Sequence, residues 1–183
     1  GITVMELAGA FTDDALRATA QFRSLRAGTA DATLSLAAGS APGRLDANAP
    51  LAATLTADLQ SLRPMQPWLG TLAVMDGRAH LALAVRGTLA DPQIGGTLAG
   101  DALRFDLPQY GVHLRDGTLR ARLADKTLYL DDFTFAGGAG KFSATGTLAR
   151  APGTGTATTR IEWKATDFTV VNRPDLQIIA DGT

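Results

Sequence analysis

The sequence contains no cysteine, which excludes disulfide bridges, iron–sulfur clusters and zinc sites built on thiolates. No stretch approaches the ~20 consecutive apolar residues that a membrane-spanning helix needs. Aromatic residues are only 6% of the chain, and the formal net charge is −1. Because the basic residues are scattered and form no stripe, nucleic acid is not an expected partner.

Histidine is also scarce, since the chain has only His80 and His113. Each lies alone in a separate segment of alternating residues, and we expect neither to have a nearby carboxylate partner. Isolated histidines of this kind make a poor metal site, so we expect both to be solvated residues of a strand. No metal site is predicted.

Acidic residues occur as adjacent pairs, at residues 13–14 and 131–132. Neighbours on a strand point to opposite faces, so such pairs are not expected to form an acid/base dyad. The stretch 137–141 is rich in glycine but lacks the spacing, the hydroxyl residue and the helix of a phosphate-binding loop. With no nucleophile elbow either, we predict no catalytic residue and no cofactor, and we do not expect an enzyme.

Hydrophobic residues make up 45% of the chain. In many segments they alternate strictly with polar residues. A period of two residues predicts β-strands with one apolar and one polar face. Such strands are typical of antiparallel sheet with one side in water. The predicted strands are Leu16–Phe22, Ala30–Leu36, Leu51–Leu59, Arg78–Val85, Leu103–Leu107, Thr118–Leu123 and Ile161–Ala165.

The register of these strands assigns side chains to faces. We expect Arg120, Arg122, Glu162 and Lys164 to be exposed to solvent. On the opposite, inner face we expect Leu119, Leu123, Ile161 and Trp163. A slip of one residue would invert every one of these assignments.

Turn signals between the strands are Asp76-Gly77, Asp116-Gly117, Gly137-Gly138, Asp181-Gly182 and Ala41-Pro42-Gly43. At about 8–12 residues for each strand and turn, the chain would form roughly 14 strands. At ~4.8 Å for each strand, the sheet would run ~60–70 Å. An alternative for residues 15–26 is a helix capped by the preceding acidic pair, although the alternation favours a strand. One short helix is expected near residues 62–69, which contain two prolines.

The tripeptide Gly-Thr-Leu occurs five times, beginning at Gly70, Gly87, Gly96, Gly117 and Gly146. Repeated units of this kind indicate a stacked architecture, in which each unit buries its apolar face against its neighbours. Proteins of this type usually work as a surface or a conduit. Both ends of the sequence look cut, so we expect residues 1–183 to be a single β segment of a longer, repeat-built protein.

Three phrases in this order carry a family resemblance. The first, Gly87–Gly96, reads Gly-x-Leu-x-x-Pro-x-Ile-x-Gly; the second, Gly111–Gly117, reads Gly-Val-x-Leu-x-x-Gly; the third, Leu128–Phe133, reads Leu-x-Leu-x-x-Phe. Together with Asn172–Leu176, preceded by Ala165–Phe168, they resemble the repeats of the TamB family. TamB is the inner-membrane subunit of the translocation and assembly module, and belongs with the AsmA-like, bridge-like lipid-transport group of Gram-negative bacteria. The resemblance is clear from about Leu51 onward.

The resemblance implies an all-β fold, a curled antiparallel sheet that forms an elongated half-pipe, or β-taco, with an apolar interior. It also implies a place in the periplasm, as part of a protein anchored in the inner membrane. The implied function is to carry phospholipid acyl chains between the inner and outer membranes and so to support outer-membrane biogenesis. An alternative is a scaffold or chaperone that helps to insert outer-membrane β-barrel proteins and autotransporters. The implied partner is an Omp85-type barrel, reached through other parts of the full protein, and nascent outer-membrane proteins are a further partner class.

The candidate residues for the groove are the bulky members of the alternating faces. A sandwich that packs this face closed is the other possible arrangement, and patterning alone does not separate the two. A lipid-binding groove would be lined by Leu81, Leu83, Val85, Leu103, Phe105, Leu119, Leu123, Phe133, Phe135, Ile161 and Trp163.

Overall fold

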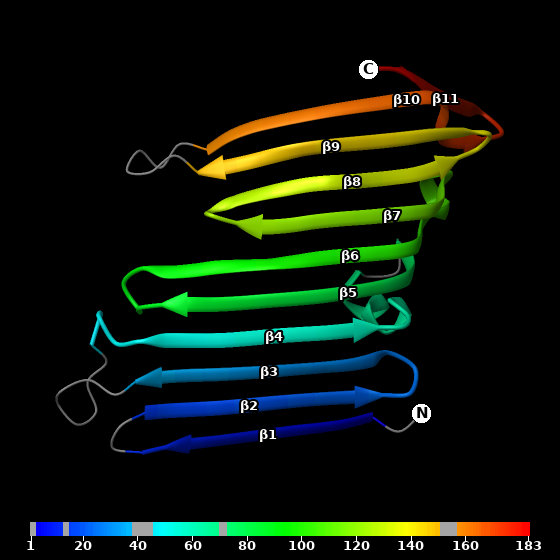
Figure 1. Cartoon of the computed structure of the whole chain (residues 1–183). Helices are drawn as coiled ribbons and strands as arrows, with labels where there is room; N and C mark the ends of the chain where they lie inside the picture. Colours follow the sequence, from blue (N-terminus) through cyan, green and yellow to red (C-terminus); the bar gives the residue numbers. More distant parts are fainter. Residues whose placement is uncertain (1–2, 13–14, 38–45, 70–72, 151–156) are drawn as a thin grey trace.

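A computed structural model describes residues 3–12, 15–37, 46–69, 73–150 and 157–183. In this part of the chain, eleven strands form one antiparallel sheet, and each strand pairs with the next one along the sequence (Figure 1). The strands are β1 (Thr3–Phe11), β2 (Ala15–Ser24), β3 (Gly28–Ala37), β4 (Leu51–Leu59), β5 (Val74–Gly87), β6 (Pro92–Leu107), β7 (Val112–Ala124), β8 (Thr127–Gly137), β9 (Gly140–Arg150), β10 (Ala157–Arg173) and β11 (Leu176–Gly182).

The all-β prediction is confirmed, and every strand predicted from the alternation lies within one of these strands. Residues 15–24 form β2, so the helical alternative for that segment is wrong. The predicted short helix is present as a 3₁₀ turn, η1 (Arg63–Met65), followed by α1 (Gln66–Leu69). The 3₁₀ turn η2 (Pro108–Tyr110) links β6 to β7.

The expected count of roughly 14 strands is wrong, because most of the Asp-Gly pairs are not turns. Gly77 interrupts the register of β5 with β6, and the pair 116–117 interrupts that of β7 with β8. The pair 181–182 likewise lies in β11, beside a shift in its register with β10. At 116–117 the extra residue lies in β7 itself, whereas at the other two pairs it lies in the facing strand, at residues 102–103 of β6 and 166–167 of β10. Each irregularity is a β-bulge, which absorbs the extra residue and lets the strand continue through a bend. Only Gly137-Gly138 is a turn, between β8 and β9; Ala41-Pro42-Gly43 lies outside the described residues.

The sheet is curled but does not close, because β1 and β11 remain its two edges. Its accessible surface is 12119 Å² for a chain of 19.0 kDa. A compact protein of this mass exposes about 8,400 Å². No large side chain in the described residues is completely buried. The fold is therefore a single curved layer with much of both faces exposed.

The Gly-Thr-Leu repeats keep bulky and small residues opposite each other in neighbouring strands. Gly96 pairs with Leu83, and a Cβ atom at Gly96 would lie 2.7 Å from a methyl group of that leucine. At Gly117 a Cβ atom would lie 2.3 Å from the ring of Phe135. Glycine at these positions makes room for the large neighbour. The copy that begins at Gly70 lies outside the described residues.

Substitution of Gly28 tests how closely β3 approaches β4. It has a φ of +117°, and a Cβ atom there would lie 1.9 Å from the carbonyl oxygen of Asp58. We expect Gly28→Ala to lower the free energy of unfolding by about 1–3 kcal/mol, because both the backbone and the neighbouring strand must shift. Urea unfolding followed by far-UV circular dichroism measures this change.

The matched control is Gly9→Ala. The nearest atom to a Cβ at Gly9 is the carbonyl oxygen of Arg17, at 3.8 Å, so this change should stay within about 0.5 kcal/mol of the parent. Equal effects of the two substitutions would contradict the close approach of β3 to β4 at Gly28.

Candidate functional site

Cross-strand pairing joins the apolar positions into continuous rows on one face of the sheet, which we call the inner face. Each row crosses ten strands, from β1 to β10, through direct pairs. The first row is Met5, Phe22, Ala30, Ala57, Leu81, Leu98, Ala121, Leu130, Gly146 and Ile161. The second is Leu7, Ala20, Ala32, Leu55, Leu83, Gly96, Leu123, Leu128, Leu148 and Thr159. The third is Thr3, Ser24, Gly28, Leu59, Ala79, Gly100, Leu119, Phe133, Ala144 and Trp163.

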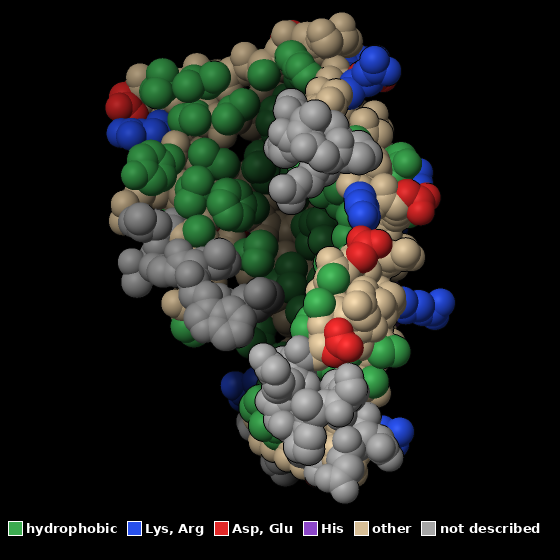
Figure 2. Space-filling view, turned by 90° about the vertical axis from the view of Figure 1, so that its left-hand side faces the viewer, with side chains coloured by type: hydrophobic (Ala, Val, Ile, Leu, Met, Phe, Trp, Pro, Cys, Tyr) green, Lys and Arg blue, Asp and Glu red, His purple; other side chains and the backbone are tan. Residues whose placement is uncertain are grey.

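All these positions lie in the described part of the chain, and none of them is charged. Figure 2 looks along the strands and shows two walls with a hollow between them, lined by hydrophobic side chains. Charged side chains lie mainly on the outer surface of the wall on the right. The inner face is thus an apolar groove, which we refer to below as the groove.

Every groove residue predicted from the sequence lies on this face. Most are members of the three rows, and Val85 lies in a shorter parallel row between Ala53 and Ile94. Phe105 pairs with Leu114 towards the other end of the strands. Of the remaining two, Phe135 forms a buried cluster with Ala165 and Phe168, and Leu103 packs against that cluster.

The sequence analysis missed several residues of the groove. Phe142 and Leu148 alternate with polar residues in β9, and this pattern could have predicted their place. Phe168 follows a bend in β10, so no periodicity marks it. Three further groove residues lie in alternating stretches for which no strand was predicted: Leu98, Leu128 and Leu130.

Large apolar side chains on the inner face are exposed to an unusual degree. Met5 and Leu7 in the edge strand β1 are 73% and 75% exposed. Ile161 and Trp163, both expected on this face, are 60% and 44% exposed. Contiguous exposed apolar surface of this kind marks a binding site in soluble proteins.

The outer face is polar, as predicted. Arg120, Arg122, Glu162 and Lys164 are all exposed. Arg120 donates to Asp101 at 2.6 Å, and Arg122 lies 3.8 Å above the ring centre of Tyr129 while it pairs with Asp131. These exposed pairs contribute little to stability, about 0–1 kcal/mol each. These charged residues identify the outer face as the side of the sheet that is in contact with water.

The histidines do have carboxylate partners, contrary to the expectation from sequence. Nδ1 of His80 lies 3.0 Å from a carboxylate oxygen of Asp58, and Nδ1 of His113 lies 3.0 Å from Asp106. Each partner comes from a neighbouring strand, so sequence proximity could not show it. Among the described residues, no group of three or more potential ligands is placed to hold a metal ion.

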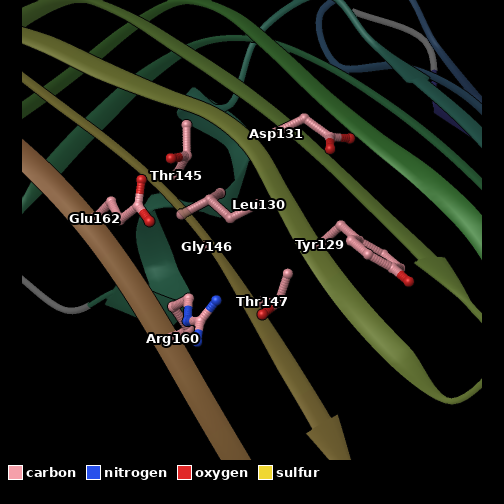
Figure 3. Close-up of a pocket in the computed structure, with 8 residues that line it drawn as sticks. All are labelled: Tyr129, Leu130, Asp131, Thr145, Gly146, Thr147, Arg160 and Glu162. Atoms are coloured by element: carbon pink, nitrogen blue, oxygen red, sulfur yellow. The ribbon is translucent and has the colours of Figure 1, made fainter.

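The pair Asp131–Asp132 was expected to point to opposite faces, and this is also wrong. A bulge in β8 turns both carboxylates to the outer face, where Asp131 pairs with Arg122 and Asp132 accepts a hydrogen bond from Thr118. Beside them lies a shallow hollow of about 280 Å³ between β8, β9 and β10 (Figure 3). Its polar lining comes from Tyr129, Asp131, Thr145, Thr147, Arg160 and Glu162. The hollow opens to solvent. The other acidic pair, at 13–14, lies outside the described residues.

A second polar feature surrounds Asp106, whose side chain is only 9% exposed. Burial alone would raise the pKa of this carboxyl group. Hydrogen bonds from His113 and Arg104, together with their positive charges, outweigh burial and hold the pKa of Asp106 below its ordinary value. These residues line an open cleft of about 610 Å³ near η1, together with Arg63 and Asp76.

The chain matches no family model, no curated protein and no solved structure. In the described part of the chain, no helix has the length and apolarity to cross a membrane. The groove is therefore interpreted from its own geometry and from the resemblance of its repeats.

The Asp106 cluster predicts a pH-dependent contribution to stability. A carboxyl group with a lowered pKa in the folded state stabilises the fold above its unfolded pKa, near 3.9, and loses that contribution as the pH falls through the lower folded value. Asp106→Asn should therefore lower the free energy of unfolding by about 1–3 kcal/mol at pH 7. Urea unfolding between pH 2 and 7 should show this difference shrinking at the acid end.

The control for this measurement is Asp125→Asn, in the exposed turn between β7 and β8. We expect it to change stability by less than about 0.5 kcal/mol at every pH. A difference between Asp106→Asn and the parent that does not depend on pH would contradict the role assigned to the Asp106 charge.

Proposed function

We propose that the groove carries phospholipid acyl chains through an aqueous compartment. The observation that carries this proposal is the set of three uncharged rows, which run without interruption across ten strands and remain open on one side. Each CH₂ group that leaves water for an apolar surface contributes about 0.8 kcal/mol. An acyl chain would therefore be held firmly.

The same binding would be non-directional, because no charged side chain lies in the rows and their hydroxyl groups, on Thr3, Ser24 and Thr159, lie only near the row ends. A chain could move along the groove from one strand to the next with similar contacts at each step. This property suits a conduit. It also requires no catalytic residue.

The resemblance of the repeats to the TamB family supports a more specific proposal. The chain would then be a β-taco segment of a periplasm-spanning protein that is anchored in the inner membrane of a Gram-negative bacterium. Lipid would pass between the inner and outer membranes, with an Omp85-type barrel as the outer-membrane partner of the full protein. The repeats and the curled sheet favour this assignment.

A second candidate is a scaffold for nascent outer-membrane β-strands, including those of autotransporters. The sheet edges favour it: among the described residues, β1 pairs with β2 alone, and residues 157–164 of β10 pair with β9 alone. An extended peptide could add to either edge through backbone hydrogen bonds. Binding of strand peptides by protein that carries no lipid would favour this candidate over the conduit.

A photoreactive side chain introduced at single positions tests the conduit in cells. At Leu83 we expect lipid adducts, because this residue lies in the second row of the groove. At Arg86, on the outer face of the same strand, we expect none. Lipid adducts of equal yield at both positions, or at neither, would contradict the proposal.

Leu83→Arg tests whether a charge in the groove blocks lipid. Desolvation of a guanidinium beside acyl chains is costly, so lipid adducts from a probe at Leu119 should fall at least about tenfold. The sheet should remain folded, because the long side chain can direct its charge to the open side. Circular dichroism checks the fold.

The matched control is Ala84→Arg, one residue along and on the outer face, where Ala84 pairs with Thr54. This variant should retain the parental adduct yield. If Leu83→Arg keeps full yield while folded, the groove does not carry the lipid.

A further inference from the structure

The connection between β4 and β5 departs from the tight turns that join most strands of the sheet. It contains η1 and α1, and Figure 1 shows this helical segment at the right-hand ends of β4 and β5. The N–H group of Leu62, which is only 6% exposed, donates to the carbonyl of Gly77 at 3.0 Å. The next residue, Arg63, then reaches the carboxylate of Asp76 in β5. These contacts fix the segment against β5.

The cleft beside this segment lies on the outer face of the sheet. Asp76 pairs with Arg104 across β5 and β6, and Asp106 pairs with His113 across β6 and β7. Phe105, between Arg104 and Asp106 in the sequence, has the opposite orientation and belongs to the groove. The sheet itself therefore lies between the cleft and the groove, so the two are separate features.

A buried carboxylate is unusual in a sheet with so much of both faces exposed. Among the described residues, Asp106 is the only charged residue that is buried. Taking a charge out of water is costly, so a group of this kind marks a candidate functional site. Asp106 accepts hydrogen bonds from Nε of Arg104 at 2.6 Å and from Nδ1 of His113 at 3.0 Å. One carboxylate thus orients both cationic side chains.

Asp76 orients Arg63 in a similar way. Burial would raise the pKa of Asp76, but hydrogen bonds from the N–H group of Gly77, from Arg63 and from the hydroxyl of Ser61 outweigh it and hold the pKa below its ordinary value. Asp76 therefore stays charged near neutral pH and keeps the guanidinium group of Arg63 in place. Because Asp76 and Arg104 are direct cross-strand partners, the two arginines lie beside the same carboxylate.

Both arginines bind their carboxylates through Nε alone. Between the described residues, no hydrogen bond uses the terminal nitrogens of Arg63 or Arg104, or Nε2 of His113. All three side chains line the same cleft. Guanidinium groups offer their donors in a planar fork that matches the oxygens of phosphates and carboxylates. The cleft thus holds two oriented guanidinium groups whose outer donors are available to a ligand.

We propose that this cleft binds a phosphate group between Arg63 and Arg104, with His113 as a third donor. A tetrahedral phosphate presents oxygens in several directions, so it can accept from η1, β6 and β7 at the same time. Val74 and Pro108 give the cleft an apolar part, which leaves room for a small organic substituent. The phosphate can therefore be inorganic or carried by a monoester.

The charges of the cleft make this binding depend on pH. The charged groups around His113, from η1, β5, β6 and β7 in turn, are Arg63, Asp76, Arg104, Asp106 and Arg115. Arg115 is paired with Asp116, and the two arginines that line the cleft balance its two aspartates. A net positive charge therefore arises only when His113 is protonated. Protonation also places a proton on Nε2, because in the neutral ring Nδ1 holds the proton that it donates to Asp106.

Isothermal titration of the chain at about pH 6 and low ionic strength tests the site with inorganic phosphate, glycerol 3-phosphate and acetate. We expect saturable binding of both phosphates, and the tighter of the two identifies the source of the phosphate group. Acetate has too few oxygens to reach all three donors, so it should bind about tenfold more weakly. Acetate that binds as tightly as phosphate would overturn the phosphate assignment.

Arg63→Gln is the main variant, because Arg63 is 75% exposed and its loss should leave the sheet folded. Phosphate affinity should fall at least about tenfold. Arg86→Gln is the matched control: it removes the same charge from the outer face of β5, at the opposite end of the strand, and should bind like the parent. Circular dichroism checks the fold. Equal weakening in both variants would reveal general charge attraction and overturn the site, as would the absence of saturable binding up to about 50 mM phosphate.

Sulfate tests the role of His113, since its own charge does not change between about pH 5 and 8. In the parent, sulfate affinity should rise at least about fivefold as the pH falls from about 7.5 to 5.5, the range in which an ordinary histidine takes up a proton. In His113→Gln, whose amide can still donate to Asp106, the affinity should stay constant. The same pH dependence in both proteins would contradict the third donor. The site lies across the sheet from the groove, so its failure would leave the proposed lipid binding untouched.

Discussion

The register between neighbouring strands is the constraint on which the rest of this structure depends. Side chains alternate with a period of two, so a slip of one residue in any strand would expose its leucines and place its charges in the groove. Nine consecutive pairings keep Met5 of β1 in line with Ile161 of β10 on the same face. The bulges at or opposite the Asp-Gly pairs absorb the extra residues that the bends require, and so preserve this alignment.

A single curled layer leaves its apolar face without a second layer to cover it. The rows alternate bulky residues such as Leu83 with Gly96, so the face is uneven and has room above the small residues. A closed sandwich would fill this space with side chains from another sheet. In the described residues, side chains fill this space mainly around Phe168, which packs with Phe135 and Ala165. Elsewhere the inner face stays open, and this is the physical basis for proposing a groove that takes up apolar chains.

The period of two was sufficient to predict the strands and their faces, because alternation and burial are directly linked. The assignments of Arg120 to water and Leu119 to the inner face follow from it. The sequence did not reveal the bulges, because Asp-Gly serves equally as a hairpin turn and as a bulge, and only the pairing of the next strand decides between them. The partners Asp106 and His113 meet across strands, and Phe168 follows a bend, so neither feature has a local signal.

The central claim is that the open apolar face binds acyl chains by burial of CH₂ groups and not through their headgroups. Isothermal titration of the chain with saturated fatty acids of eight to twelve carbons tests it most directly. The account predicts that affinity rises about two- to fourfold for each added CH₂ group, with a negative heat-capacity change. Affinity that does not change with chain length, or that follows the charge of the headgroup instead, would contradict it.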